Sequence, residues 1–148
     1  MADHRETSRR ALEVFNTGEF DSLEGVYTAD CAVHDTQNAF AAQARGLDVL
    51  RGQVSMFRAA SPDLTMTIDA QYEDGDVVIN RWTSTATQTG DLPMLPATGR
   101  TATVTGILID RYEGDQIAEV WSSWDTLGML QQLGALPSSR PSSAERPA

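Results

Sequence analysis

The sequence contains only one cysteine, Cys31, among its 148 residues. A single thiol permits no intramolecular disulfide and no metal site built from several cysteines. We interpret Cys31 as a small apolar residue of the core. No run of apolar residues approaches the length of a membrane span, and the polar start Met1–Glu6 lacks the apolar region of a signal peptide. We therefore expect a cytoplasmic protein.

Basic residues are also few. Eleven of them stand against twenty-one acidic residues, which gives a net charge of −10. A surface of this sign repels phosphate backbones and anionic lipid headgroups. We therefore expect no nucleic-acid partner and no membrane partner. The sequence also lacks a glycine-rich phosphate-binding loop, a pair of CxxC motifs and an internal repeat.

What is present is the composition of one globular domain. Hydrophobic residues make up 41% and charged residues 22% of the chain, a balance that supports a packed core. A chain of this length fits a single core. Residues 137–148 are rich in proline and serine and have almost no apolar side chain to bury. We therefore predict a folded domain over residues 1–136 and a disordered tail after it.

Helical spacing of apolar residues predicts three helices in the first part of the chain. They cover Asp3–Asn16, Asp21–Tyr27 and Gly46–Ala60. The third helix ends at Ser61-Pro62, because a residue before proline avoids the α region. A brief extended segment, Cys31–His34, lies between the second and third helices.

Alternation of apolar and polar residues then predicts four long strands and a short helix. The first strand begins near Leu64, and the others and the helix cover Val77–Thr89, Arg100–Tyr112, Gln116–Trp124 and Thr126–Leu133. Consecutive strands joined by tight turns pair antiparallel. The sequence therefore predicts an α+β cone, in which three N-terminal helices pack in a strongly bent four-stranded antiparallel sheet around a pocket for a small organic ligand.

Two segments resemble the SnoaL-like polyketide cyclases of the nuclear transport factor 2-like superfamily. They are Thr85–Arg100 and Glu119–Gly134, and the similar pattern runs from the first helix to Gly134. The resemblance implies an enzyme without metal or organic cofactor that closes the last ring of an aromatic polyketide by an intramolecular aldol step. It also implies that the aspartate at Asp125 is the acid/base. Many relatives carry histidine where this chain has Gln88, so an imidazole role is not transferred to that position.

Asp125 has two interpretations. An aldol closure needs a base to remove a proton and an acid to return one, and a single carboxyl group can do both. Burial beside Trp121 and Trp124 would raise its pKa toward a useful value. Alternatively, Asp125 caps the helix that starts at Thr126, where accepted amide hydrogens would lower its pKa.

Four further residues are candidates for substrate binding. Trp121 lies four residues before Asp125, so on a continuous strand both face the same side, and Trp121 is either a stacking wall or a core residue. His34, beside Asp35, is either a polarising imidazole at the cone mouth or a solvated residue.

Arg81 and Gln88 are the other two candidates. Arg81 either binds an enolate or carboxylate inside the cone or pairs with an acid such as Glu119 or Asp110. Its neighbour Asn80 points to the opposite face, and parity alone does not say which of the two faces inward. Gln88 stands at the strand end where relatives have histidine.

Three functions remain open from the sequence. The first is cofactor-free cyclisation of an aromatic, anthracycline-like polyketide, and the second is cofactor-free hydroxylation of such a ring. The third is binding of a small molecule without catalysis. We also expect a homodimer or homotetramer, because the outer face of a bent sheet can pack on a second copy, with Ile107, Ile109 and Val120 as candidate contacts.

Overall fold

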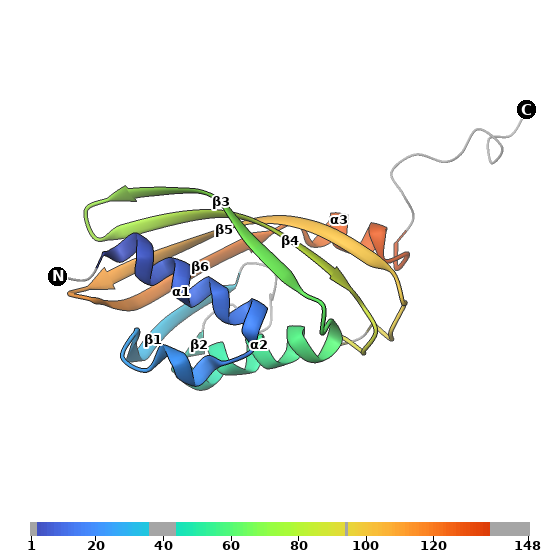
Figure 1. Cartoon of the computed structure of the whole chain (residues 1–148), viewed down its shortest axis with the longest axis horizontal. Coiled ribbons are helices and arrows are strands. Elements are labelled where there is room, and N and C mark those ends of the chain that lie inside the picture. The colour runs from blue at the N-terminus through green and yellow to red at the C-terminus, as the bar shows by residue number, and fades with distance from the viewer. Residues whose placement is uncertain (1–2, 36–43, 94, 137–148) are drawn as a thin grey trace, which may run out of the picture.

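A computed structural model describes residues 3–35, 44–93 and 95–136. Helices α1 and α2 lie against one side of a long curved sheet, and α3 lies at the opposite end of the sheet from the N-terminus (Figure 1). The helical elements are α1 (His4–Thr17), the 3₁₀ turn η1 (Phe20–Leu23), α2 (Leu47–Ala60) and α3 (Thr126–Gln132). The strands are β1 (Tyr27–Asp35), β2 (Ala44–Arg45), β3 (Thr65–Asp74), β4 (Val77–Thr87), β5 (Thr101–Glu113) and β6 (Gln116–Trp124).

The sheet has six strands in the order β2-β1-β6-β5-β4-β3. All neighbours pair antiparallel except β1 and β6, which pair parallel. The four-stranded meander β3 to β6 follows the sequence prediction, and the α+β class is confirmed. The predicted purely antiparallel sheet of four strands is wrong, because β1 and β2 extend it on the β6 side and make it mixed.

The predicted helix over Asp21–Tyr27 is also wrong. Only the short turn η1 forms there, Gly25 has a positive φ of 80°, and Tyr27 already begins β1. The nine-residue β1 is stabilised by its pairing with β6, which lies about ninety residues further along the chain. Local apolar spacing carries no information about such a distant partner, so tertiary pairing overrides the local pattern.

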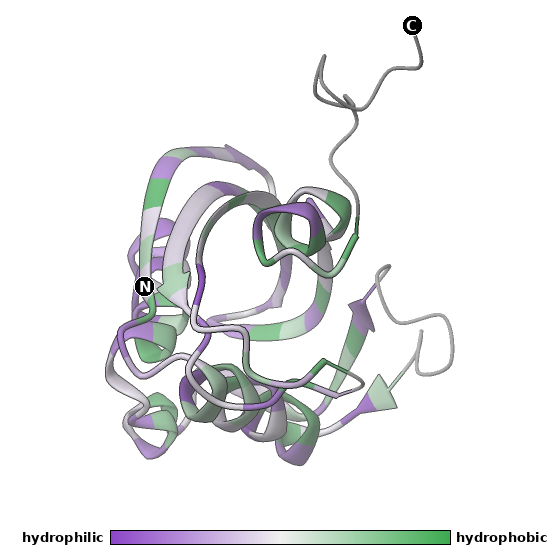
Figure 2. Ribbon diagram, turned by 90° about the vertical axis from the view of Figure 1, so that its right-hand side faces the viewer, coloured by the Kyte–Doolittle hydropathy of each residue, from purple (hydrophilic) through white to green (hydrophobic). Residues whose placement is uncertain are grey.

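The strong twist and bend of the sheet make its two faces very different. Viewed from the α3 end, the strands follow a strongly curved path, and helices lie on the open side of the curve (Figure 2). Even-numbered residues of β4, β5 and β6, such as Trp82, Val104 and Val120, are buried on the inner face. Odd-numbered residues such as Arg81 and Ile107 are exposed on the outer face. Whether a strand residue has an even or an odd number therefore decides which of the candidate residues from the sequence can reach the interior.

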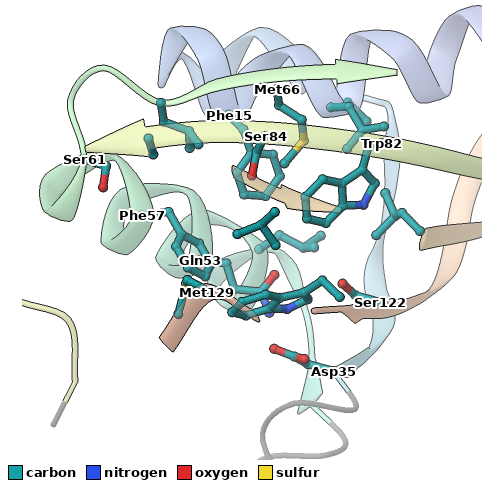
Figure 3. Close-up of a pocket in the computed structure, with 18 of the residues that line it drawn as sticks. Phe15, Asp35, Gln53, Phe57, Ser61, Met66, Trp82, Ser84, Ser122 and Met129 are labelled. Atoms are coloured by element: carbon teal, nitrogen blue, oxygen red, sulfur yellow. The ribbon is translucent and has the colours of Figure 1, made fainter. Parts of the chain in front are cut away.

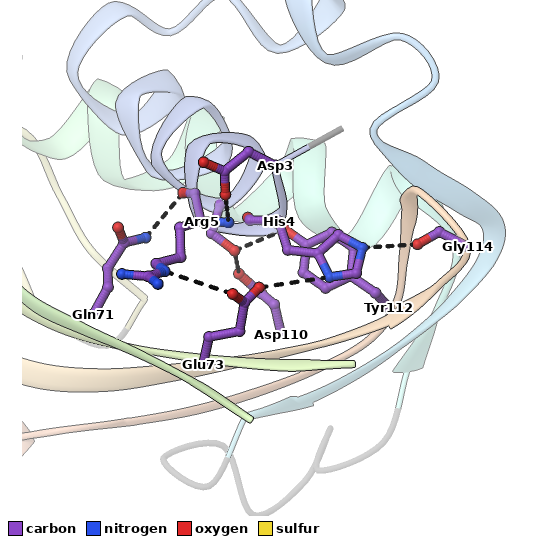
Figure 4. Close-up of polar contacts among 9 residues, drawn as sticks. Asp3, His4, Arg5, Gln71, Glu73, Asp110, Tyr112 and Gly114 are labelled. Atoms are coloured by element: carbon purple, nitrogen blue, oxygen red, sulfur yellow. Dashed lines mark hydrogen bonds and ion pairs between the residues drawn. The ribbon is translucent and has the colours of Figure 1, made fainter. Parts of the chain in front are cut away.

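Polar contacts fix the N-terminal end of α1 to the far ends of the strands (Figure 4). The His4 ring stacks on Tyr112 with centroids 3.9 Å apart, and the Tyr112 hydroxyl donates to the His4 carbonyl oxygen at 2.8 Å. Ser8 Oγ donates to Asp110 Oδ2 at 2.6 Å, and Asn80 Nδ2 approaches the same oxygen at 3.2 Å. These contacts close the narrow end of the cone.

Asp110 is the most buried acid of this network. Its side chain is 1% exposed, and Oδ1 has no hydrogen-bond partner among the residues that the structure describes. Burial raises the pKa of Asp110 to about 6, against the lowering effect of the hydrogen bonds from Ser8 and Asn80.

In the described part of the chain, no helix is both long and apolar enough to cross a bilayer. Within the same residues, no group of three or more His, Cys, Asp or Glu side chains is arranged to hold a metal ion. Cys31 is fully buried, as expected of a core residue, and burial raises the pKa of its thiol to about 12. The predicted tail at 137–148 lies outside the described residues.

Candidate functional site

The curved sheet and the helices enclose a cavity with mostly apolar walls. Its aromatic lining residues come from five elements, and they are Phe15, Tyr27, Phe57, Trp82 and Trp124. The polar side chains that line it are few, and they are Asp35, Gln53, Ser61, Ser84 and Ser122. A concave apolar site with a few polar groups is the usual form of a small-molecule site.

Two of the polar groups are neighbours in the sheet. Asp35 at the end of β1 stands opposite Ser122 of β6 in the parallel pairing, and Gln53 reaches the same region from α2 (Figure 3). Asp35 is half-buried. Among the described residues that line the cavity, Asp35 is the only acidic one. The cavity therefore combines one carboxyl group with a hydroxyl and a carboxamide.

The two tryptophans of the cavity meet across a glycine. Trp82 of β4 pairs with Gly106 of β5, which in turn pairs with Trp124 of β6. A Cβ atom at Gly106 would overlap the Trp82 indole and lie 2.8 Å from Trp124 Cβ. The Trp124 ring also meets Phe57 of α2 edge to face, with centroids 6.1 Å apart. Absence of a side chain at Gly106 thus lets both indoles form one wall of the cavity.

Asp125 lies outside this cavity. It is exposed, and its Oδ1 accepts a hydrogen bond from the Gly128 amide at 2.9 Å, as an N-cap of α3. The strand ends at Trp124, so the alternation that would place Asp125 beside Trp121 does not continue to it. The structure therefore supports the capping interpretation of Asp125 and does not include it among the residues that line the cavity.

Trp121 and His34 come together, but on the outer face of the sheet. Their rings stack with centroids 5.3 Å apart and an interplanar angle of 16°. His34 Nε2 lies 2.7 Å from Glu119 Oε2, and Arg111 Nε donates to Glu119 Oε1 at 3.0 Å. The contact with His34, then that with Arg111, lowers the pKa of Glu119. The expectation that Trp121 and His34 line the hollow is corrected. The residues on either side of each of them, Val120 and Ser122 on β6 and Val33 and Asp35 on β1, line the cavity, and neighbours on a strand face opposite sides.

Arg81 and Gln88 are also placed differently from the prediction. Arg81 is exposed on the outer face, and its neighbour Asn80 is the residue that faces inward, fully buried. The expected pairing of Arg81 with Glu119 or Asp110 is not formed. Gln88 lies on the inner face but is 2% exposed and bonded to the loop that follows β4. Val120 likewise lines the cavity, so it is not an outer-face contact.

Sequence reasoning therefore missed most of the residues that line the cavity. It did not name Trp82 or Trp124 among the candidates for substrate binding, and it treated Asp35 only as the neighbour of His34. One signal was present for the tryptophans, because a glycine inside a strand pattern marks a close approach of other groups, and Gly106 stands in the middle of β5. No such signal marks Asp35, whose position depends on the parallel pairing of β1.

Comparison with known proteins fits this geometry. The model of the SnoaL-like polyketide cyclase family matches residues 5–133. The chain belongs to this family. No curated protein sequence matches it.

Solved structures of several other proteins share the fold over most of the chain. A proposed polyketide cyclase from Acidithiobacillus ferrooxidans is 29% identical, with a TM-score of 0.76 over 90% of this chain and 96% of that one. IdmH from Streptomyces antibioticus, also a proposed polyketide cyclase, is 26% identical, with a TM-score of 0.76 over 90% and 99%. AclR from Streptomyces galilaeus, a proposed hydroxylase, is 19% identical, with a TM-score of 0.80 over 95% and 86%, and this likeness shows the fold alone.

Proposed function

We propose that this member of the family closes a ring of an aromatic polyketide by an intramolecular aldol step, with Asp35 as the acid/base. The observation that carries the proposal is the position of Asp35. It is the one acidic side chain among the described residues lining a cavity whose other walls are mostly aromatic and aliphatic side chains, with a few uncharged polar groups. Flat aromatic substrates stack well on such walls.

The chemistry needs only proton transfers. The Asp35 carboxylate removes a proton from a carbon made acidic by adjacent carbonyl groups, and the resulting enolate attacks a second carbonyl carbon of the same molecule. A carbon–carbon bond forms, the attacked oxygen becomes an alkoxide, and the protonated Asp35 returns the proton to it. Substrate and product therefore have the same mass.

Ser122 and Gln53 have supporting roles in this proposal. A hydroxyl and a carboxamide beside the carboxyl group can donate hydrogen bonds to an oxygen on which charge develops. Trp82 and Trp124 would hold the ring system in the plane that brings the reacting carbon to Asp35. The apolar walls exclude water, which strengthens these electrostatic contacts.

A matched pair of aspartate variants tests the role of Asp35. Wild type, Asp35→Asn and Asp125→Asn are incubated with an anthraquinone-type polyketide ester without added cofactor, in air and under nitrogen, and products are followed by mass spectrometry. We expect a product of unchanged mass from wild type and Asp125→Asn, and none from Asp35→Asn. Loss of turnover in Asp125→Asn alone would restore the sequence-based assignment. Gain of one oxygen atom in air only would indicate hydroxylation, and tight binding without conversion would indicate a binding protein.

We also propose that the outer face of the sheet pairs with a second copy of this chain. An apolar row crosses four strands in register, formed by Tyr72, Ile79, Ile109 and Trp121. Tyr72 is 57% exposed, and Ile107 beside the row is 45% exposed. A two-fold axis would bring such a row onto itself and cover both copies. Light scattering on the Ile107→Asp, Tyr72→Asp double variant should report a monomer, and a monomeric wild type would overturn the proposal.

A further inference from the structure

Two segments bound the end of the cavity that lies farthest from the N-terminus. One is the loop 88–100 between β4 and β5, which contributes Leu92 to the cavity lining. The other is α3, from which Met129 lines the cavity, with Leu133 just after the helix. Both segments lie at the α3 end of the sheet (Figure 1). We call them the two lips of the cavity.

A carboxamide adds hydrogen bonds between the α3 lip and the sheet to the packing of Leu133 and Met129 in the cluster that contains Trp82. β6 ends at Trp124, and its pairing with β5 begins only at Gly106, so the backbone of Thr103 has no strand partner on that side. Gln132 fills this place. Its Oε1 accepts from the Thr103 amide at 2.8 Å, and its Nε2 donates to the Thr103 carbonyl oxygen at 2.8 Å. The side chain thus replaces one residue of a neighbouring strand.

The loop lip is held by a second carboxamide. Gln88 Oε1 accepts from Thr98 Oγ1 at 2.8 Å and from the Thr98 amide at 3.2 Å, and Gln88 Nε2 donates to the Leu95 carbonyl oxygen at 3.2 Å. The start of the loop is fixed to the end of α2, because the Gly90 amide donates to the Ala60 carbonyl oxygen at 2.9 Å. Gln88 therefore links the second half of the loop to the strand end.

These two amides have different surroundings. Gln88 is buried, whereas its partners Leu95 and Thr98 are half-buried. Without the Gln88 carboxamide these loop groups lose their hydrogen-bond partner, and the loop has to shift to pair them with water. Gln132 is exposed and its bonds to Thr103 lie at the surface, so water can replace them and the fold survives its loss. Both losses remove side-chain hydrogen bonds that help to position a lip, the one that carries Leu92 for Gln88 and the one that carries Met129 for Gln132.

We infer that Gln88 and Gln132 are positioning residues that set which ligand lengths the cavity binds. The inference rests on the proposed function for the ligand class, a flat aromatic molecule. A ligand long enough to reach the lips contacts Leu92 and Met129, so its affinity depends on how these side chains are positioned. A shorter ligand does not reach these side chains, so its affinity does not depend on them.

The test compares two probes of different length. Dissociation constants of a dihydroxynaphthoquinone and a longer dihydroxyanthraquinone are measured by quenching of tryptophan fluorescence, since Trp82 and Trp124 line the cavity. We expect Gln132→Met and Gln88→Met each to weaken the longer probe about tenfold, the effect of roughly one net hydrogen bond or packing contact, and to leave the shorter probe within about twofold. Thr98→Val, which removes one bond to Gln88, should act in the same direction.

Gln71→Met is the matched control. Gln71 also bridges backbone and side chains through its carboxamide, but at the closed end of the cone, where it donates to the Arg5 carbonyl oxygen at 3.0 Å and to Asn80 Oδ1 at 2.8 Å. Its loss should leave the ratio of the two dissociation constants unchanged. A general loss of stability would instead weaken both probes in all variants alike.

Hydrogen exchange supplies a readout that needs no ligand. The Thr103 amide should exchange faster in Gln132→Met and the Thr98 amide faster in Gln88→Met, each without change at the other site. Equal weakening of both probes, an unchanged ratio, or failure of wild type to bind either probe would overturn the inference. Loss of the ring-closing activity alone would not, because the probe ratio involves no turnover, so the two proposals fail separately.

Discussion

Asp35 stands opposite Ser122 where β1 and β6 run parallel, and both side chains line the cavity. This one pairing distinguishes the cone from the simple meander that the sequence predicts. Without β1 beside β6, the inner face of the sheet would end at Ser122, and the described lining of the cavity would contain no carboxyl group. The proposed chemistry therefore depends on the pairing of two strands that lie far apart in the sequence.

The first prediction concerns this pair. Ser122→Ala should retain turnover at a reduced rate, because only one hydrogen-bond donor is lost, whereas Asp35→Asn should lose about 100- to 10,000-fold in kcat/KM, the usual contribution of a general acid/base. Steady-state kinetics with a common substrate measures both. An equal loss of kcat/KM in the two variants would mean that Asp35 and Ser122 act in substrate binding rather than in proton transfer.

The second prediction concerns the glycine between the tryptophans. Gly106→Ala should lower the free energy of unfolding by about 1 to 3 kcal/mol, because the added methyl group overlaps the Trp82 indole. Urea denaturation followed by fluorescence measures the change.

Gly52→Ala is the control for that variant. Gly52 lies within α2, and no atom lies within 4 Å of the place that a methyl group would take there, so the substitution should raise stability by up to about 1 kcal/mol. A Gly106→Ala protein as stable as wild type would show that the two indoles do not need the close approach.

The third prediction separates capping from catalysis at Asp125. Asp125→Ala should lower stability by about 0.5 to 2 kcal/mol, the usual effect of losing an N-cap, while Asp125→Asn should stay close to wild type because asparagine is also a good cap. Thermal unfolding ranks the three proteins. Similar stability of all three would contradict the role of the Gly128 contact.

Sequence reasoning found the helices α1 and α2 and the four strands of the meander because each has a local signal. It failed where a long-range contact decides the structure. The β1–β6 pairing fixes Asp35 in the cavity, and the end of β6 at Trp124 removes Asp125 from the strand pattern. On β6 itself, alternate residues of both parities are large or polar, so the sequence does not say that Ser122 rather than Trp121 faces inward.

The last prediction is a pH dependence of stability that comes from Asp110. Its pKa is raised by burial from 3.8 to about 6, so the folded state prefers the protonated form. Between these two values the folded protein binds more protons than the unfolded chain, and stability therefore falls as pH rises through this window. The difference of about 2 pKa units corresponds to about 3 kcal/mol at most.

The Asp110→Asn variant isolates this effect. Asparagine can still accept a hydrogen bond from Ser8 but carries no charge, so the stability of the variant should not show this decline with rising pH. The free energy of unfolding of wild type relative to Asp110→Asn should therefore be higher near pH 4 than near pH 7. Acids whose pKa is lowered, such as Glu119, have the opposite pH dependence in both proteins and cancel in the difference. Asp115→Asn, at an exposed acid of the β5–β6 turn, should follow wild type at both values. A constant difference between wild type and Asp110→Asn across this range would mean that Asp110 ionises as readily in the fold as in the unfolded chain, and that its unpartnered oxygen is solvated.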